Sequence, residues 1–291
     1  MLRVEDTLRK NSMILRDIWL PLRRLAGRAI KRGGQQTKDV MADPVNVLNA
    51  TSLSNQVSKY KIKPGYVEQE SPGYFEDIPD GIVYQPDVYV LAGILAQLVG
   101  AHYLVDLGCG FAQKLIDTSR CYSLNPIGLD YGANLIHCRD TYPEGQWIEA
   151  DFENPAHNLL GKEVLERSVI ICSDLIEHLR DPTSLVSLLR EWLRFARLGL
   201  ISTPERDVRW GDKHNGPPPN PHHVREWNAE ELDTYLRGSG LTVNFVGLTR
   251  SKNTAYSMWT MFVLLGATKE PSTSAGEQTV VTGEELQLFG K

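Results

Sequence analysis

The stretch 102–110, His102-Tyr103-Leu104-Val105-Asp106-Leu107-Gly108-Cys109-Gly110, decides the fold of this chain. Its first six residues form a short, largely apolar run with an acid near its end, which predicts a buried β-strand. Two glycines come next, and a helical pattern begins at Ala112. Glycine permits a tight turn and lets the backbone approach a ligand closely. The stretch therefore predicts a strand, a ligand-binding turn and a helix.

Other segments of the chain also have strand character, and helical patterns separate most of them. They are 126–129, 146–150, 168–173, 198–203, 241–247 and 258–265. Acids follow the first three, at Asp130, Asp151 and Asp174. Strands and helices that alternate in this way predict an α/β fold. We expect a Rossmann-like, doubly wound sheet of about seven strands, mostly parallel, with helices on both faces.

Helix starts are marked at three places. Pro86, ahead of the first strand, is typical of the first turn of a helix. Asp181 followed by Pro182 predicts an N-cap and the first helical residue. Asn228 with Glu231 three residues later is typical of a capping box.

Composition excludes several classes of protein. The chain has 291 residues, of which 42% are hydrophobic and 23% charged, and its net charge is -5. These values exclude wholesale disorder and a collagen-like structure. The four cysteines have no CxxC spacing and give no sign of an oxidising compartment. The longest apolar stretch, 89–105, is interrupted by Gln97 and His102 and is a poor membrane span, so we expect a cytoplasmic protein.

The N-terminus differs from the rest in charge. Residues 1–32 contain nine lysines and arginines against three acids, together with apolar residues. This predicts a basic amphipathic segment that attaches peripherally to an anionic membrane or docks on a protein, unless it packs on its own domain. We expect a polar linker over 33–64, one compact domain over 65–268 and a flexible tail over 269–291.

The acids at the strand ends favour one kind of ligand. A dinucleotide-binding turn would have a third glycine where this chain has Gln113. Asp106, two residues before the turn, would repel a pyrophosphate but attract an ammonium group. Asp130 suits a ribose diol, and Asp151-Phe152 suit the amine and ring of an adenine. A ligand with an ammonium, a ribose and an adenine but no phosphate is S-adenosylmethionine.

The motif 105–110 resembles the first motif of class I S-adenosylmethionine-dependent methyltransferases. Asp130 and Asp151-Phe152 fall where that family places its ribose and adenine contacts, and the resemblance covers roughly 84–265. Ala112 stands where many members have a third glycine. The resemblance implies that 65–268 is a methyltransferase domain. The residues expected to contact the cofactor are Tyr84, Gln85, Asp106, Gly108, Gly110, Asp130, Tyr131, Asp151, Phe152, Ser173 and Asp174.

The segment after 168–173 is expected to carry the chemistry. Asp174, Glu177 and His178 would share one face of a helical turn. Two carboxylates and an imidazole can bind a divalent cation such as magnesium, or supply a general base for a hydroxyl. They could instead hold the loops of a cleft together by hydrogen bonds.

This segment resembles the fourth motif of ubiquinone-biosynthesis O-methyltransferases and of small-RNA terminal 2′-O-methyltransferases. Both have a Glu-x-x-Glu-His pattern that binds a divalent metal, with Asp174 here in place of the first Glu. His223 resembles a later histidine of the RNA enzymes. The resemblance implies a metal quartet of Asp174, Glu177, His178 and His223. We expect Glu177, His178 and His223 to be the catalytic residues.

A long, polar, proline-rich loop follows 198–203 and predicts a substrate lid. Arg206, Asp207, Arg225 and Trp227 are candidates to bind a polar substrate, although Arg225 and Trp227 could simply anchor the lid. The loop resembles that of bacterial methyltransferases associated with glycan assembly.

Three functions remain open. The leading hypothesis is an S-adenosylmethionine-dependent O-methyltransferase acting on a hydroxyl of a sugar, a glycan precursor or a related polar metabolite. An RNA 2′-O-methyltransferase is the alternative, but the acidic balance outside residues 1–32 argues against a nucleic-acid partner. The third is a non-catalytic cofactor-binding subunit that docks on a partner enzyme through residues 1–32.

Overall fold

The computed structural model describes residues 58–70, 77, 83–156, 158–252 and 255–267, which belong to one compact unit. The basic segment 1–32, the larger part of the expected linker and the expected tail lie outside these residues. No helix within the described ranges is long and apolar enough to cross a bilayer.

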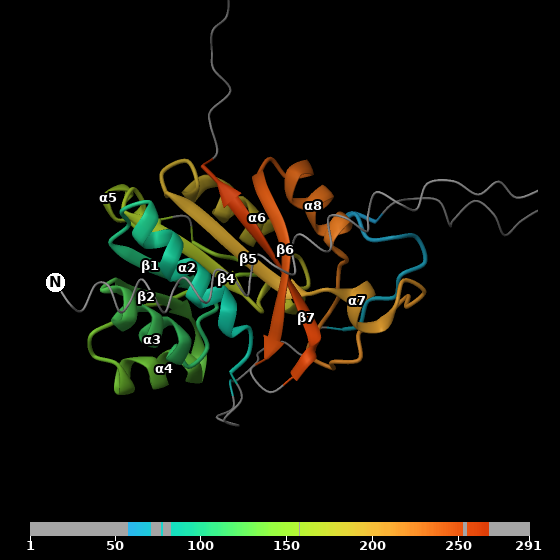
Figure 1. Cartoon of the computed structure of the whole chain (residues 1–291), viewed down its shortest axis with the longest axis horizontal. Helices are drawn as coiled ribbons and strands as arrows, with labels where there is room; N and C mark the ends of the chain where they lie inside the picture. Colours follow the sequence, from blue (N-terminus) through green and yellow to red (C-terminus); the bar gives the residue numbers. More distant parts are fainter. Residues whose placement is uncertain (1–57, 71–76, 78–82, 157, 253–254, 268–291) are drawn as a thin grey trace, which may run out of the picture. The chain divides into compact units, whose positions relative to one another are not determined.

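The described part of the chain is built on a seven-stranded sheet with the order β3-β2-β1-β4-β5-β7-β6 (Figure 1). Strands β1 to β5 are parallel to one another, and β7 is antiparallel to both β5 and β6. This is the Rossmann-like, doubly wound arrangement that the sequence predicts. The strands are β1 Tyr103–Leu107, β2 Asn125–Asp130, β3 Gln146–Glu149, β4 Ser168–Ser173, β5 Leu198–Pro204, β6 Thr242–Lys252 and β7 Ala255–Gly266.

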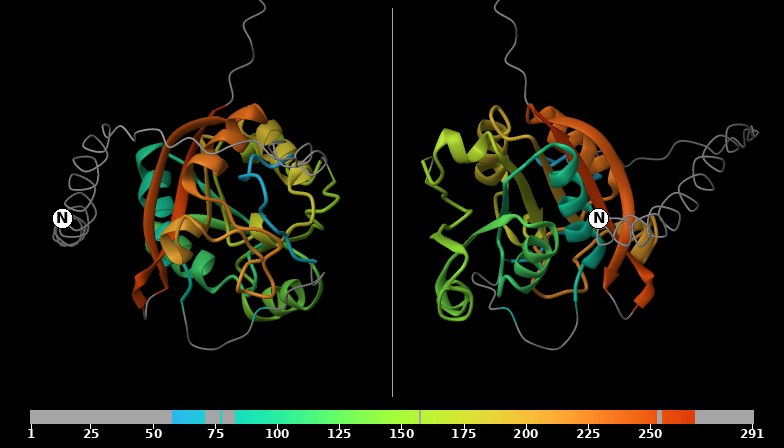
Figure 2. Two further views of the ribbon diagram at one scale, coloured as in Figure 1. Left: turned by 90° about the vertical axis from the view of Figure 1, so that its right-hand side faces the viewer. Right: turned by 60° about the vertical axis from the view of Figure 1, so that its left-hand side comes forward.

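Helices cover both faces of the sheet (Figure 2). The apolar side chains of α2, α3 and α4 share one core cluster, and those of α5, α6 and α8 share the other. Successive residues of β4 enter the two clusters alternately, because side chains of a strand point to opposite faces. The helices are α2 Pro86–Leu98, α3 Gln113–Tyr122, α4 Gly132–Thr141, α5 Lys162–Leu165, η1 Ile176–His178, α6 Thr183–Trp192, α7 Arg206–Trp210 and α8 Ala229–Gly238.

The predicted helix starts are close to the observed ones. Helix α2 begins at Pro86, and α8 begins with the predicted capping box of Asn228 and Glu231. Helix α6 begins at Thr183, one residue later than predicted, because Pro182 takes the cap position. Asp181 still stabilises this start, since its Oδ1 accepts a hydrogen bond from the Thr183 N–H at 3.0 Å.

Strands β6 and β7 are longer than the sequence predicts. Their pairing continues to Lys252 and Ala255, whereas the pairing of β5 with β7 ends at Pro204 and Thr260. The two strands therefore extend beyond the carboxyl end of β5 as a hairpin stabilised by its own ladder. The apolar pattern did not reveal this part because residues 249–252 are all polar.

The domain begins before residue 65, which shortens the linker expected over 33–64. Ile62 is only 1% exposed and belongs to the core beside α6 and α8. The Lys63 N–H donates to Glu231 at 2.9 Å, and the Trp227 indole donates to the Tyr60 carbonyl at 3.0 Å. Residues 58–70 thus form a strap on the domain, which we call the N-terminal strap.

Candidate active site

The glycine turn after β1 has the geometry that the sequence predicts. Gly108 and Gly110 have φ values of 73° and 53°, in the left-handed region that favours glycine. Ala112, at the N-cap of α3, also lies in this region, with φ of 57°. The Gly110 N–H donates to Asp130 Oδ2 at 2.8 Å. The end of β2 is thereby fixed against the turn.

Asp106 is fully buried beneath this turn. The Tyr89 hydroxyl donates to its Oδ2 at 2.8 Å, while Oδ1 has no hydrogen-bond partner among the described residues. Burial raises the pKa of Asp106 to about 7. A buried carboxylate oxygen without a donor is costly, and a cationic donor would remove that cost.

Asp130 is nearly buried and is already held by the protein. Besides Gly110, the Tyr131 N–H donates to it at 2.8 Å and the Asn134 amide at 3.4 Å. Burial raises its pKa above the ordinary value in spite of these donors. Asp130 therefore stabilises the turn in addition to any contact with a ribose.

Of the pair Asp151-Phe152, the first residue lies at the surface and the second in the core. Asp151 is exposed, and its Oδ1 accepts a hydrogen bond from the Glu153 N–H at 2.9 Å. Phe152 is buried in the core on the side of α6. Its ring is occupied by packing, which corrects the expectation that it offers a flat face to an adenine.

Gln85, one of the residues expected to contact the cofactor, is buried and links the ends of β4 and β5 through its side chain. Its amide donates to Asp174, and its Oε1 accepts hydrogen bonds from the hydroxyls of Ser173, at 3.1 Å, and Ser202. Ser202 was not predicted from the sequence; it pairs with Ser173 at the carboxyl ends of β5 and β4. Tyr84, the residue before Gln85, is 43% exposed.

Three of the four expected metal ligands come together. Ligand atoms of Glu177, His178 and His223 all lie within 4.8 Å of one another. The Val224 N–H donates to the Glu177 carbonyl at 2.8 Å and joins the two segments that carry them. Asp174 is not a member of this group among the residues described, and its side chain accepts a hydrogen bond from Gln85. The expected quartet is thus a trio here.

Glu177 is fully buried, whereas the neighbouring His178 is only partly buried. Neither carboxylate oxygen of Glu177 has a hydrogen-bond partner within the described part of the chain. Burial and the charge of Asp174 raise the pKa of Glu177 well above its ordinary range. Nδ1 of His178 lies 2.8 Å from the His222 carbonyl, which only accepts, so Nδ1 carries the proton. Burial lowers the pKa of His178 to about 3, so its ring is neutral.

His223 is held on both ring nitrogens. Nδ1 lies 2.7 Å from Oε1 of Glu226, and Nε2 lies 2.8 Å from Nδ2 of Asn220. The His222 N–H donates to Asn220 Oδ1 at 3.0 Å, which fixes the orientation of the amide. Neither partner of His223 was predicted from the sequence. Both could have been recognised from their spacing, because Asn220 stands three residues before His223 and Glu226 three residues after it.

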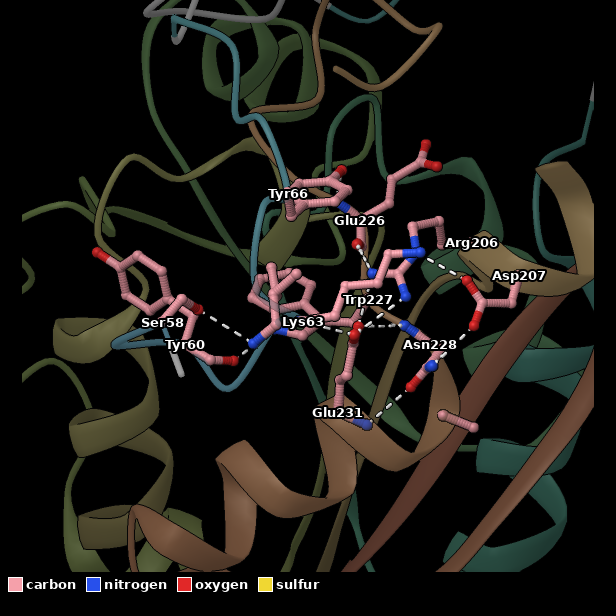
Figure 3. A network of polar contacts seen from close by, with 12 residues as sticks. Ser58, Tyr60, Lys63, Tyr66, Arg206, Asp207, Glu226, Trp227, Asn228 and Glu231 are labelled. Carbon is pink, nitrogen blue, oxygen red and sulfur yellow. Dashed lines mark hydrogen bonds and ion pairs between the residues drawn. The ribbon is translucent and has the colours of Figure 1, made fainter. Parts of the chain in front are cut away.

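The expected lid is a packed segment that contains α7. The side chains of Arg206, Arg225 and Trp227 are buried and already have partners in the protein. Arg206 makes a two-pronged ion pair with Glu231 at 2.6 and 3.0 Å (Figure 3). This arrangement corrects the expectation that these three side chains contact a substrate, since each anchors the segment instead.

The partners of these anchors are distant in sequence. Arg225 donates to Glu68 of the N-terminal strap at 2.8 and 3.1 Å and to the carbonyls of Leu179 and Arg180, both at 2.7 Å. Asp207 is partly exposed and accepts hydrogen bonds from Arg206 and from the Asn228 amide.

Comparison with known proteins gives relatives for half of the chain. No family model matches it. It is 30% identical over 149 residues to a protein of Mycobacterium tuberculosis (strain CDC 1551 / Oshkosh) named as a probable S-adenosylmethionine-dependent methyltransferase, covering 50% of this chain and 51% of that protein. It is 32% identical over 153 residues to a protein of Mycolicibacterium smegmatis with the same description, covering 51% and 55%. The chain spans about half the length of these curated relatives.

Solved structures resemble it at lower identity. The methyltransferase domain of bacterial CtHen1-C is 17% identical with a TM-score of 0.48, covering 63% of this chain and 98% of that one. Magnesium protoporphyrin IX methyltransferase from Synechocystis, with bound SAH, is 15% identical with a TM-score of 0.45, covering 62% and 81%. The cyclase SpnF is 12% identical with a TM-score of 0.47, covering 70% and 87%.

Proposed function

We propose that this protein is a class I S-adenosylmethionine-dependent methyltransferase. The observation that carries the proposal is the buried carboxylate of Asp106, whose Oδ1 has no donor among the described residues. Asp106 stands next to the turn of Gly108 and Gly110, whose positive φ values and lack of side chains allow the backbone to approach a ligand of this carboxylate closely. The ammonium group of an amino-acid ligand would supply the missing donor. The names of the curated relatives support the same activity.

In this proposal the cofactor lies at the carboxyl ends of β1, β2 and β4, the edge where parallel sheets bind their ligands. Asp130 would accept from the ribose, and Asp151, being exposed, from the adenine amine. Gln85 would close the methionine end together with its partners. The full set assigned to the cofactor is Tyr84, Gln85, Asp106, Gly108, Gly110, Asp130, Tyr131, Asp151, Ser173 and Asp174.

The reaction that we propose is O-methylation of a polar acceptor such as a sugar or glycan precursor. Methyl transfer is an in-line displacement, so holding the acceptor hydroxyl in line contributes much of the rate. Glu177, His178 and His223 are grouped closely enough to hold this hydroxyl and to accept its proton. RNA remains the second candidate acceptor, and the net negative charge of the chain disfavours it.

A divalent cation fits the same three residues. Both buried oxygens of Glu177 lack a donor within the described ranges, and carboxylate and neutral imidazole are suitable cation ligands. Glu177, His178 and His223 would hold the ion, which when bound would polarise the acceptor hydroxyl as a Lewis acid. Residues 1–32 would provide the contact with a membrane surface or a partner protein.

The test is transfer of labelled methyl from S-adenosylmethionine into fractionated host extract, with and without a chelator. Label in a glycan or lipid-linked fraction is the expected result, and loss of label on chelation would establish the cation. Label in an RNase-sensitive fraction would instead identify RNA as the methyl acceptor. No label in any fraction would contradict the proposed activity.

A further inference from the structure

Gln85 adopts a backbone conformation that its residue type does not favour. It stands at the N-cap of α2 with φ of 48° and ψ of 49°, in the left-handed region that non-glycine residues seldom occupy. An N-cap residue usually has an extended backbone and a side chain that accepts from the first turn, but the Gln85 side chain makes no such bond. The conformation therefore does not serve the start of the helix.

The Gln85 side chain serves the edge of the sheet that we assign to the cofactor. It is buried there against the hydroxyls of Ser173 and Ser202 and the carboxylate of Asp174. Asp174 is itself left-handed, with φ of 52°, and its N–H donates to the Ser202 carbonyl at 3.0 Å. Two strained residues thus meet in one hydrogen-bonded group. Such residues cluster at functional sites and persist only where their surroundings hold them.

The last residues of β6 hold the backbone of Gln85. The Gln85 N–H donates to the Ser251 carbonyl at 2.8 Å. The preceding residue, Tyr84, forms an antiparallel bridge with Lys252. The chain that leads into α2 is therefore paired with β6 at the residue whose conformation is strained.

An ion pair ties the same end of β6 to the first turn of α2. Asp87 accepts from the Arg250 guanidinium at 2.7 and 3.0 Å and from the Thr249 hydroxyl at 2.9 Å. Arg250 lies in the part of the β6–β7 hairpin that extends beyond β5. We call the contacts of residues 249–252 with residues 84–87 the hairpin clasp.

Packing holds α2 in the fold independently of the hairpin clasp. The buried residues of this helix include Val88, Tyr89, Ala92 and Ala96. The side chains of Asp87 and Arg250 are 32% and 37% exposed, and ion pairs that are partly exposed contribute little to stability. Gln85, by contrast, has no intrinsic preference for its left-handed conformation. Loss of the clasp should therefore disturb Gln85 much more than the global fold.

We propose that Asp87 and Arg250 are positioning residues for the cofactor site. Their ion pair holds the end of β6 against α2, and the Ser251 carbonyl then keeps Gln85 left-handed, with its amide on Asp174. Neither residue of the ion pair touches the cofactor in this proposal, because both act through Gln85. The inference rests on the proposed function for its effect on cofactor binding.

The test is a double-mutant cycle on the affinity of the full chain for S-adenosylmethionine, measured by isothermal titration calorimetry. Arg250→Met breaks the ion pair, and Gln85→Gly removes the side chain at a residue that then adopts positive φ without strain. We expect each variant to weaken binding about tenfold, and the double variant to bind no more weakly than Gln85→Gly alone. Arg250→Lys, which keeps the charge, should lose less affinity than Arg250→Met.

Amide hydrogen exchange of the Gln85 N–H, recorded without cofactor, reports on the hairpin clasp directly. We expect this exchange to accelerate about tenfold or more in Arg250→Met. Arg237→Met is the matched control for both measurements. Arg237 also makes a partly exposed ion pair, with Asp233, and it contacts Val243 near the other end of β6. The control should change neither the affinity nor the exchange.

Unchanged affinity or unchanged exchange in Arg250→Met would overturn the inference, and so would equal effects in Arg237→Met. Additive losses of affinity in the double variant would also overturn it, because the ion pair would then act independently of Gln85. Exchange requires no ligand. A wild type that binds no S-adenosylmethionine, while Arg250→Met accelerates exchange as expected, would therefore count against the proposed function and support the clasp.

Discussion

Glu177 shows how burial governs a single residue of the site. Its pKa is raised above the ordinary value of 4.5, because burial and Asp174 both disfavour the ionised form. The folded state then holds its proton more tightly than the unfolded state does. This residue's contribution to the stability of the folded protein is therefore complete below pH 4.5 and is lost as the pH rises towards the folded pKa.

We predict that Glu177→Gln removes this pH dependence. Without added metal, the variant should match the wild type near pH 4.5 and exceed it in unfolding free energy by about 1–3 kcal/mol at pH 8. Urea unfolding at the two pH values measures the difference. Adding magnesium at pH 8 should stabilise the wild type and leave the variant unchanged, because only the former can bind the ion. A variant less stable than the wild type at pH 8 without metal would contradict the account.

At the scale of elements, the ion pair of Arg225 with Glu68 joins the N-terminal strap to the segments of His178 and His223. We predict that Arg225→Met lowers the unfolding free energy by about 3 kcal/mol, since it leaves two carbonyls and a carboxylate without their charged donor. Arg237→Met is the control, because Arg237 is exposed and, among the described residues, pairs with Asp233 on its own helix and with the Val243 carbonyl. Its cost should be below about 1 kcal/mol. Equal costs in denaturant unfolding would argue against the anchoring role.

The N-terminal strap gives a second prediction at this scale. A chain that begins at residue 65 lacks Ile62 and the contacts of Tyr60 and Lys63 with the segment 227–231. We expect its Tm to lie roughly 5–10 °C below that of a chain that begins at residue 52, for a loss of about 2–3 kcal/mol. Thermal unfolding followed by circular dichroism compares the two. Identical Tm values would show that residues 58–64 do not stabilise the domain and belong to the linker.

The site was predictable where short segments determine it. Strands β1 to β5, the glycine turn and Asp106 follow from local apolar patterns, since parallel strands are buried on both faces. Arg206 and Arg225 resemble substrate ligands in the sequence, because nothing local reveals that Glu231 and Glu68 neutralise them. The position of Asp174 outside the metal-binding trio was also not predictable from local sequence. Its hydrogen-bond partner Gln85 lies 89 residues earlier in the chain. Contacts between segments that are distant in sequence can be assigned only once the folded structure is known.

At the scale of the whole molecule, the account depends on S-adenosylmethionine binding at the turn after β1. Asp106, with its pKa near 7, is largely protonated at pH 6 and must ionise to receive an ammonium group. Binding should therefore release close to one proton at pH 6 and few at pH 8. Asp106→Asn should weaken binding about 100-fold and abolish this release, because it removes a charge-assisted hydrogen bond.

Isothermal titration calorimetry of S-adenosylmethionine tests this claim most directly. Titrations at pH 6 and pH 8, in buffers of different ionisation enthalpy, report both the affinity and the protons released. Asp151→Asn is the matched control, because it makes the same change at an acid that is exposed, whereas Asp106 is buried. The account predicts tight binding by the wild type, proton release at pH 6, a large loss in Asp106→Asn and a smaller one in Asp151→Asn. Equal affinity of the wild type and Asp106→Asn would contradict it.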